Sequence, residues 1–191
     1  MFEIRVHGRG GQGVVTAAEL LSVAAFDEGK HAQAFPSFGS ERMGAPVASY
    51  CRIADAEIRL REPIMEPDAL IIQDSTLLHS VDVFAGLGTE GFLLINSTRS
   101  FTELGIAEFT ERFAPNHATC VNATEIAQRH VGRPLPNAAL LGGFAALTRA
   151  LTLGAVLKAI RERFSGTIGE ANAAAAQEAH DTVLNAKGRL P

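Results

Sequence analysis

The sequence predicts an α/β protein in which helices cover both faces of an open, mostly parallel sheet. Strand-like and helix-like segments alternate along the first two thirds of its 191 residues. Two almost wholly apolar strands, at 68–74 and 92–96, have the pattern of strands covered on both faces. A glycine-rich turn joins the first strand to the first helix. Together these features indicate a Rossmann-like three-layer sandwich formed by a single domain, residues 1–191.

The first elements follow from periodicity and from turn residues. Residues 2–7 alternate apolar and polar side chains and are predicted to form a strand. Residues 14–28 carry apolar side chains at helical spacing and precede Gly29, a typical helix stop. Short strands are predicted at 31–35 and 47–53, on either side of a loop rich in Ser, Gly and Pro.

The later elements continue the alternation and then become helical. A short helix is expected between the two apolar strands, near 77–85. A strand at 118–122 should precede a helix at 124–130. The last third is rich in Ala and Gly, so its helices are expected to pack closely. These helices are predicted at 137–151, 153–164 and 168–186.

Composition and charge exclude several classes of function. The formal net charge is −4 and no two Lys or Arg residues are adjacent, so neither nucleic acid nor a membrane surface is an expected partner. The charged first strand leaves no room for a signal peptide, and no apolar run approaches the roughly 20 residues that span a bilayer. A cytoplasmic protein without a membrane segment is expected.

Two cysteines, Cys51 and Cys120, lie far apart and without a CxxC pattern. This spacing indicates buried structural thiols in a reducing compartment and gives no metal site. An iron-sulfur cluster takes four thiolates, which this chain cannot supply.

The segment GRGGQG, residues 8–13, is the first candidate ligand-binding loop. Glycines at a strand-to-helix turn permit positive φ, and the first amides of the helix then face whatever occupies the turn, which suits a phosphate. Gly8, Gly10 and Gly13 match the G-x-G-x-x-G dinucleotide fingerprint.

Two known uses of such a loop are disfavoured. NAD binding needs an acidic residue about 20 positions further on, but residues 33–36 read QAFP, and Asp27 and Glu28 belong to the first helix. A Walker loop needs a Lys-Ser/Thr pair after the glycines, which is missing. Two alternatives stay open: a loop that binds another anion, and a tight turn that binds nothing.

A second loop, PSFGSERMGAP at 36–46, places Ser37, Ser40, Glu41 and Arg42 between two prolines. If the strands at 2–7 and 31–35 are parallel neighbours, both loops leave the same sheet edge and form one polar rim.

The two loops in this order carry a resemblance to a known family. The segments are GRGGQGVVTAAELLSVAA (8–25), EGKHAQAFPSFGSERMGAPVASYCRI (28–53), PDALIIQD (67–74) and INST (95–98). LPNAALLGG (135–143) and EAN (170–172) match more weakly. On these residues the chain resembles the gamma subunit of the 2-oxoacid:acceptor oxidoreductases, the pyruvate:ferredoxin oxidoreductase group.

The resemblance implies a complex that oxidatively decarboxylates a 2-oxoacid with coenzyme A. The products are an acyl-CoA and CO2, and the electrons pass to ferredoxin or another acceptor. The resemblance leaves the 2-oxoacid open among pyruvate, branched-chain acids, aryl acids such as phenylglyoxylate, 2-oxoglutarate and indolepyruvate, because members for all of these share this type of gamma chain. Thiamine diphosphate, Mg and iron-sulfur clusters are expected in alpha, beta and delta sibling subunits, and the gamma subunit is associated with coenzyme A. The expected contacts to coenzyme A are Gly8, Arg9, Gly10, Gly11, Gln12, Gly13, Ser37 and Arg42.

Three hypotheses remain. The chain is a non-catalytic subunit that handles coenzyme A, an architectural interface subunit of the same complex, or a free-standing nucleotide-binding dehydrogenase. The missing ribose acid disfavours the third. Gln12 either contacts coenzyme A or caps a neighbouring loop. Arg42 contacts coenzyme A, pairs locally with Glu41, contacts a sibling subunit, or stays on the solvated surface. His7 is expected to be a hydrogen-bonded structural residue, so no catalytic residue is assigned and the isolated chain should be inactive.

Overall fold

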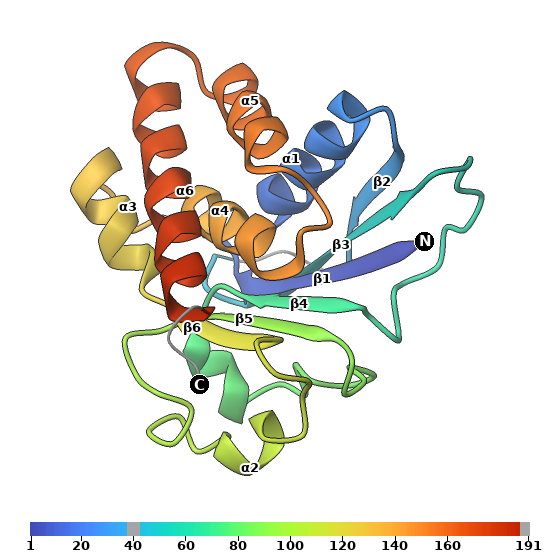
Figure 1. Ribbon diagram of the computed structural model, residues 1–191, viewed down its shortest axis with the longest axis vertical. Coiled ribbons are helices and arrows are strands. Elements are labelled where there is room, and N and C mark those ends of the chain that lie inside the picture. The colour runs from blue at the N-terminus through green and yellow to red at the C-terminus, as the bar shows by residue number, and fades with distance from the viewer. Residues whose placement is uncertain (38–42, 188–191) are drawn as a thin grey trace.

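The computed structural model describes residues 1–37 and 43–187. In this part of the chain the strands form a six-stranded sheet with the order β2-β3-β1-β4-β5-β6 (Figure 1). The strands are β1 (Phe2–Arg9), β2 (His31–Pro36), β3 (Pro46–Ala54), β4 (Ala69–Ile72), β5 (Phe92–Asn96) and β6 (Ala118–Val121). Strands β1, β4, β5 and β6 are parallel, whereas β3 is antiparallel to both β1 and β2. The predicted open, mostly parallel sheet is confirmed.

Helices lie on both faces of the sheet, but one helical layer is much thicker than the other. One face carries α1 (Val14–Asp27), α3 (Ala123–Val131), α4 (Asn137–Thr148), α5 (Leu153–Arg163) and α6 (Gly166–Lys187). The other carries only short helices among the described residues, the 3-10 helix η1 (Ser75–His79) and α2 (Ala107–Thr110) (Figure 1). None of the described helices combines the length and the apolar composition that crossing a bilayer requires.

The prediction of a short helix near 77–85 is wrong. Only η1 forms there, and turns follow it. The Asp74 side chain accepts from the Thr76 amide and so fixes the start of η1. The carbonyls of Val83 and Ala85 accept hydrogen bonds from the buried Arg5 guanidinium, so neither serves a longer helix.

Alternation along β1 sorts its side chains between the two layers. Ile4 and Val6 are fully buried against the helices of the thicker layer. Arg5 and His7 point to the opposite face, where both are buried. Arg5 donates to the Ile64 carbonyl at 3.2 Å as well as to those of Val83 and Ala85. A buried guanidinium therefore holds two loops against this face of the sheet, since unpaired burial would be costly.

Helix α4 is the centre of the thicker layer, and every residue from Asn137 to Leu147 is buried. Gly142 lets α6 approach α4 directly, because a Cβ at this position would overlap the carbonyl oxygen of Ala176. The Ala- and Gly-rich composition of the last third thus serves close helix packing, as predicted.

We predict that Gly142→Ala destabilises the chain by more than about 2 kcal/mol, because backbone atoms on α6 cannot yield as a flexible side chain can. Gly154→Ala in α5 is the matched control, since the nearest atom to its new Cβ lies at 3.9 Å. The control should be neutral or stabilising by up to about 1 kcal/mol. Urea unfolding measures both variants, and equal effects would contradict the packing argument.

Candidate functional site

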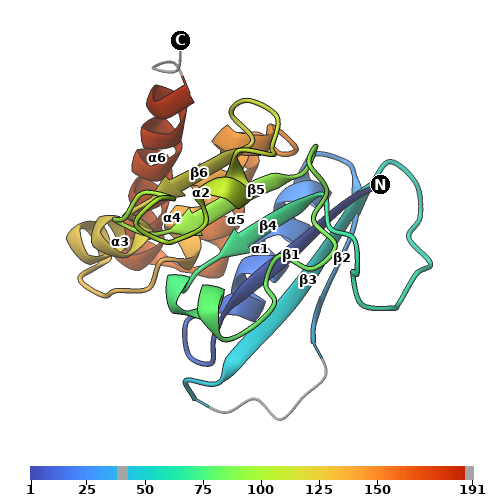
Figure 2. The same ribbon diagram turned by 90° about the horizontal axis from the view of Figure 1, so that it is seen from below.

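The crevice between β1 and β4 is the point where the chain changes direction across the sheet. After β1 the chain builds β2 and β3 on one side, and from β4 onward it builds the other side. Ligands of open α/β sheets bind at such switch points, beyond the carboxyl ends of the strands. The loop 8–13 follows β1, and Gln73 and Asp74 follow β4. Figure 2 shows these two connections side by side.

Glycines allow α1 to begin directly above this crevice. Gly13 is the N-cap residue of α1 and has a φ of 74°. A Cβ at Gly13 would lie 2.6 Å from Nδ2 of Asn137, at the start of α4. A Cβ at Gly8 would lie 2.6 Å from Cγ2 of Val14. The glycines therefore permit positive φ and close packing, and α1 begins where it was predicted to begin.

Arg9 and Gln12 are tied to Asp74 across the crevice. The Gln12 carboxamide accepts from the Arg9 amide at 2.7 Å and donates to Oδ2 of Asp74 at 3.0 Å. Nε of Arg9 donates to the same oxygen at 3.1 Å, and Nη2 donates to the Thr76 hydroxyl at 2.8 Å. Of the two roles considered for Gln12, this geometry matches the cap of a neighbouring loop.

The Asp74 carboxylate is held in its charged form. Its burial works against ionisation, but hydrogen bonds from Thr76 and Gln12 and the charge of Arg9 outweigh it, so the pKa lies below its ordinary value. Because Arg9 compensates this charge, the crevice does not present an unpaired anion to a ligand.

The returning half of the second loop packs onto the first. The Gly10 amide donates to the Ala45 carbonyl at 2.9 Å, and the Gly44 amide donates to the Gly10 carbonyl at 3.0 Å. Arg9 also donates to the Gly44 carbonyl at 3.1 Å. The two loops therefore meet, but both backbone groups of Gly10 are already paired.

Of the two predicted contacts on the second loop, Ser37 and Arg42, the structure describes only Ser37. Strands β1 and β2 run in the same direction, but they are not neighbours, because β3 lies between them. The Ser37 amide donates to the Ala48 carbonyl, and Ala48 pairs with His7, so Ser37 lies about two strand spacings, roughly 10 Å, from β1. Ser40, Glu41 and Arg42 lie outside the described residues.

The N-terminus of α1 opens into a pocket of about 490 Å³. The first intrahelical hydrogen bond runs from Ala17 to Gly13, so three earlier amides point beyond the helix, and no described side chain caps them. The pocket is lined by Gly11, Gln12, Gly13, Thr16, Val131, Arg133, Leu135, Asn137, Phe164, Ile168 and Asn172. It combines a positive helix end, a cation and an apolar wall.

Arg133 is the cation of this pocket. It is exposed and forms no ion pair with a described residue. Leu135 and Ile168 are exposed apolar side chains, at 37% and 59%. This pocket therefore matches a ligand that carries both phosphate and apolar or amide groups.

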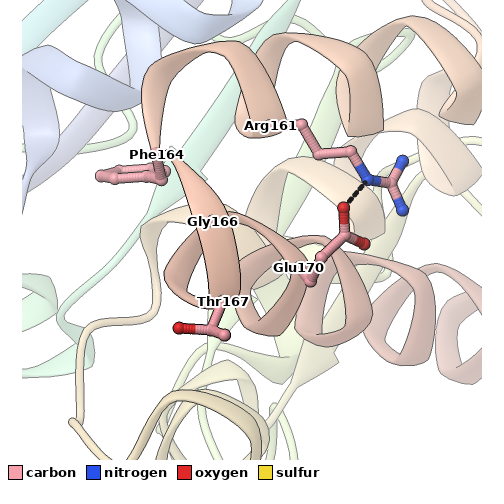
Figure 3. A pocket seen from close by; sticks show the side chains of 5 residues that line it. All are labelled: Arg161, Phe164, Gly166, Thr167 and Glu170. Carbon is pink, nitrogen blue, oxygen red and sulfur yellow. Dashed lines mark hydrogen bonds and ion pairs between the residues drawn. The ribbon is translucent and has the colours of Figure 1, made fainter.

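A neighbouring surface pocket of about 640 Å³ lies where α5 meets α6 (Figure 3). Its cation, Arg161, pairs with Glu170 at 2.9 Å. The pairing neutralises the charge, so this pocket is a weaker anion site although it also lies at a helix N-terminus. Phe164 lines both pockets.

His7 is not suited to acid-base chemistry. It is 7% exposed, and burial, with a smaller contribution from the charge of Arg5, lowers its pKa to about 4. Its Nε2 atom has no described hydrogen-bond partner, which differs from the expected paired structural histidine. Burial raises the pKa of the Cys51 and Cys120 thiols to about 12. No group of three or more His, Cys, Asp or Glu side chains that could hold a metal occurs among the described residues.

Several site residues were not identified from the sequence alone. Thr16, Arg133 and Asn137 lie on the pocket only because α4 starts beside Gly13. The motif LPN at 135–137 was the available signal. Gln73 and Asp74 stood at the end of an apolar strand, where ligand-facing residues of parallel sheets occur.

Fold and site together define a Rossmann-like domain with a glycine-rich loop at its switch point. Residues 3–182 match the family model described as pyruvate ferredoxin/flavodoxin oxidoreductase. The chain belongs to this family, as a gamma-type subunit of the 2-oxoacid:ferredoxin oxidoreductases.

Curated relatives match over nearly their whole length. Pyruvate synthase subunit PorC of Methanocaldococcus jannaschii is 46% identical over 188 residues, which is 98% of this chain and 100% of the relative. The common gamma subunit of the pyruvate/ketoisovalerate oxidoreductases of Thermococcus kodakarensis is 48% identical over 96% of this chain and 98% of the relative.

Solved structures agree with the fold. The pyruvate oxidoreductase subunit PORC of Thermotoga maritima is similar with a TM-score of 0.79 and 34% identity, over 94% of this chain and 95% of that chain. A 2-oxoglutarate:ferredoxin oxidoreductase of Magnetococcus marinus, solved with 2-oxoglutarate, coenzyme A and succinyl-CoA, has a TM-score of 0.71 and 14% identity. This chain covers 31% of it, and the likeness shows the fold alone.

We predict that His7 makes the stability of the chain depend on pH. The pKa of His7 is about 4 in the folded chain, below the unfolded value of 6.5. The unfolded chain therefore takes up a proton on His7 first as the pH falls. The contribution of His7 to the free energy of unfolding is fully present above about pH 6.5 and is lost as the pH falls toward 4. Relative to His7→Phe, the wild type should lose roughly 2 kcal/mol between pH 7 and pH 5. Urea unfolding at pH 7, 6 and 5 measures this, and parallel pH profiles would contradict it.

Proposed function

We propose that this chain is the subunit that handles coenzyme A in a multi-subunit 2-oxoacid:acceptor oxidoreductase. The complex would oxidatively decarboxylate a 2-oxoacid with coenzyme A to an acyl-CoA and CO2, and pass two electrons to ferredoxin or another acceptor. The observation that carries the proposal is the uncapped N-terminus of α1, which opens into the pocket beside Arg133.

The chemistry of coenzyme A supports this assignment. Its phosphates suit the α1 amides and the Arg133 guanidinium, which forms no ion pair with a described residue. Its pantetheine arm is apolar with two amides, and the pocket wall combines Leu135 and Ile168 with the amides of Asn137 and Asn172. Gly11 and Gly13 allow the ligand to approach the backbone.

The remaining cofactors are assigned to sibling subunits. Cys51 lies in β3 and Cys120 in β6, with three strands between them, so the two thiols do not face one another. In this proposal the iron-sulfur clusters therefore belong to sibling subunits. We also assign thiamine diphosphate and Mg to sibling subunits, among alpha, beta and delta, and propose that the isolated chain is inactive. The names of the relatives, a pyruvate synthase subunit and a pyruvate/ketoisovalerate oxidoreductase subunit, favour pyruvate or ketoisovalerate over aryl 2-oxoacids.

An architectural role is the second candidate. Phe26, Met43 and Met65 are 76%, 87% and 71% exposed, and exposed apolar side chains of this size are common at subunit interfaces. A free-standing dehydrogenase is less well supported. On the side of β1 away from β4, the neighbouring strand is the antiparallel β3 in place of a parallel β2, and β2 ends at Phe35 and Pro36 without an acidic residue.

We predict that Arg133→Gln in the assembled complex raises the apparent coenzyme A constant about ten- to a hundredfold. A charge-assisted contact to phosphate contributes roughly 1.5–3 kcal/mol, and the lost charge cannot be replaced by the amide. The constant for the 2-oxoacid should stay unchanged. Initial rates at varied coenzyme A, with subunit retention on a sizing column, provide the measurement.

The matched control is Arg112→Gln, which removes a cation in the turn after α2, on the opposite face of the sheet. It should leave the coenzyme A constant at the wild-type value. An intact Arg133→Gln complex with normal saturation by coenzyme A would favour the architectural role instead.

A further inference from the structure

The outer strand β2 has an unpaired edge that the proposed function does not use. It lies at one end of the sheet, and no strand among the described residues pairs with its outer side (Figure 1). The Ser37 amide donates to the Ala48 carbonyl in register with the ladder, so the odd-numbered residues of β2 form the hydrogen bonds to β3. The amides and carbonyls of Ala32 and Ala34 therefore point outward.

The middle of this edge lacks the features that normally prevent strand pairing. Protected edges carry Lys, Pro or bulges along the strand. Ala32 and Ala34 instead have small side chains, which pack against the helices. Pro36, which has no N–H, closes one end of the edge. The Lys30 amide closes the other end, because it already donates to the Ala25 carbonyl at 3.0 Å.

The two ends of β2 have complementary shapes. A groove of about 520 Å³ lies beside the start of the strand, and residues 29–33 line it together with the exposed Phe26 of α1 and Ile58 of the loop after β3. The end of the strand carries the apolar pair Phe35 and Pro36. A two-fold axis through the centre of β2 would exchange the groove and the pair, so the edge is complementary to itself.

We propose that β2 pairs with β2 of a second copy of this chain, antiparallel and about a two-fold axis at Gln33. In this register the amide and carbonyl of Ala32 bond to those of Ala34 in the second copy, so all outward groups of both residues are paired. A shift by two residues in either direction would place Pro36, which has no N–H, or Lys30, whose amide is already used, opposite one of these carbonyls. The hydrogen bonds therefore select one register.

The same register brings the apolar groups of the two copies together. Pro36 lies on the helix-covered face of the sheet, as Ala34 does, so it would meet Phe26 at the end of α1. Phe35 lies on the opposite face and directly across from His31 of the second copy, so these two rings would lie side by side. These contacts add apolar burial to a short ladder that would be marginal alone. The pocket of Arg133 stays free, and the proposal does not depend on coenzyme A.

Cross-linking of the 191-residue chain tests the register. Residue 33 lies on the axis, where the two Cα atoms of a non-hydrogen-bonded pair are about 4.5 Å apart, a distance that a disulfide spans. In a Cys120→Ser background, which leaves only the buried Cys51, Gln33→Cys should form a covalent dimer on oxidation with copper phenanthroline. Non-reducing electrophoresis measures the product.

His31→Cys is the matched control on the same strand and the same face of the sheet. Its two copies would be offset by four residues, roughly 14 Å along the strand, which is too far for a disulfide. Equal cross-linking at both positions, or at neither, would overturn the proposal. The Gln33→Cys dimer should also form in the assembled complex, and its absence there would assign the edge to a sibling subunit instead.

Ala34→Pro tests the hydrogen bonds between the copies. The Ala34 amide points away from β3, so the substitution removes no bond within one chain, but it removes a donor to the second copy. The dissociation constant of the dimer, measured by sedimentation equilibrium, should rise at least tenfold. Unchanged association of Ala34→Pro, or a wild-type chain that sediments as a monomer, would contradict the pairing.

Discussion

The hydrogen bonds that join Asp74 to the loop after β1 determine where the functional surface lies. One carboxylate oxygen accepts from both Arg9 and Gln12, which fixes the turn before Gly13 relative to the end of β4. Because the α1 amides follow this turn, they point into the pocket beside Arg133 rather than toward Asp74. The same contacts compensate the negative charge of the Asp74 carboxylate, so this group does not repel an anionic ligand. This network, together with the close packing of Gly13 against Asn137, holds the start of α1 beside the pocket of Arg133.

The layers behind the site follow from how β1 divides its side chains. Ile4 and Val6 join a large core under five helices, whereas Arg5 fixes loops on the opposite face through three carbonyls. Arg52 repeats this device on β3, pairing with Glu3 at 2.6 Å and donating to the Glu62 carbonyl at 2.7 Å. The sheet therefore has one face built by helix packing and one held partly by buried charges, and the crevice opens at its carboxyl edge.

Local signals predicted much of the fold, and long-range contacts account for the rest. The start of α1 at Val14 follows from the glycines and helical spacing, and the apolar strands β4 and β5 follow from composition. The insertion of antiparallel β3 between β1 and β2 depends on pairing across the sheet, which periodicity does not encode. The false helix near 77–85 has the same origin, since Arg5 of a distant strand binds its carbonyls. The glycine loop was predicted as a site, but Arg133 gains its place on the pocket only from tertiary neighbours.

Hydrogen exchange of the assembled complex, with and without coenzyme A, tests the central claim most directly. The claim is that the start of α1 and the segment before α4 bind coenzyme A. We expect slower exchange of the amides at 13–16 and 133–137 when coenzyme A is present, because bound phosphate and pantetheine shield them. Unchanged exchange at both segments, with protection confined to the partner subunits, would contradict the account.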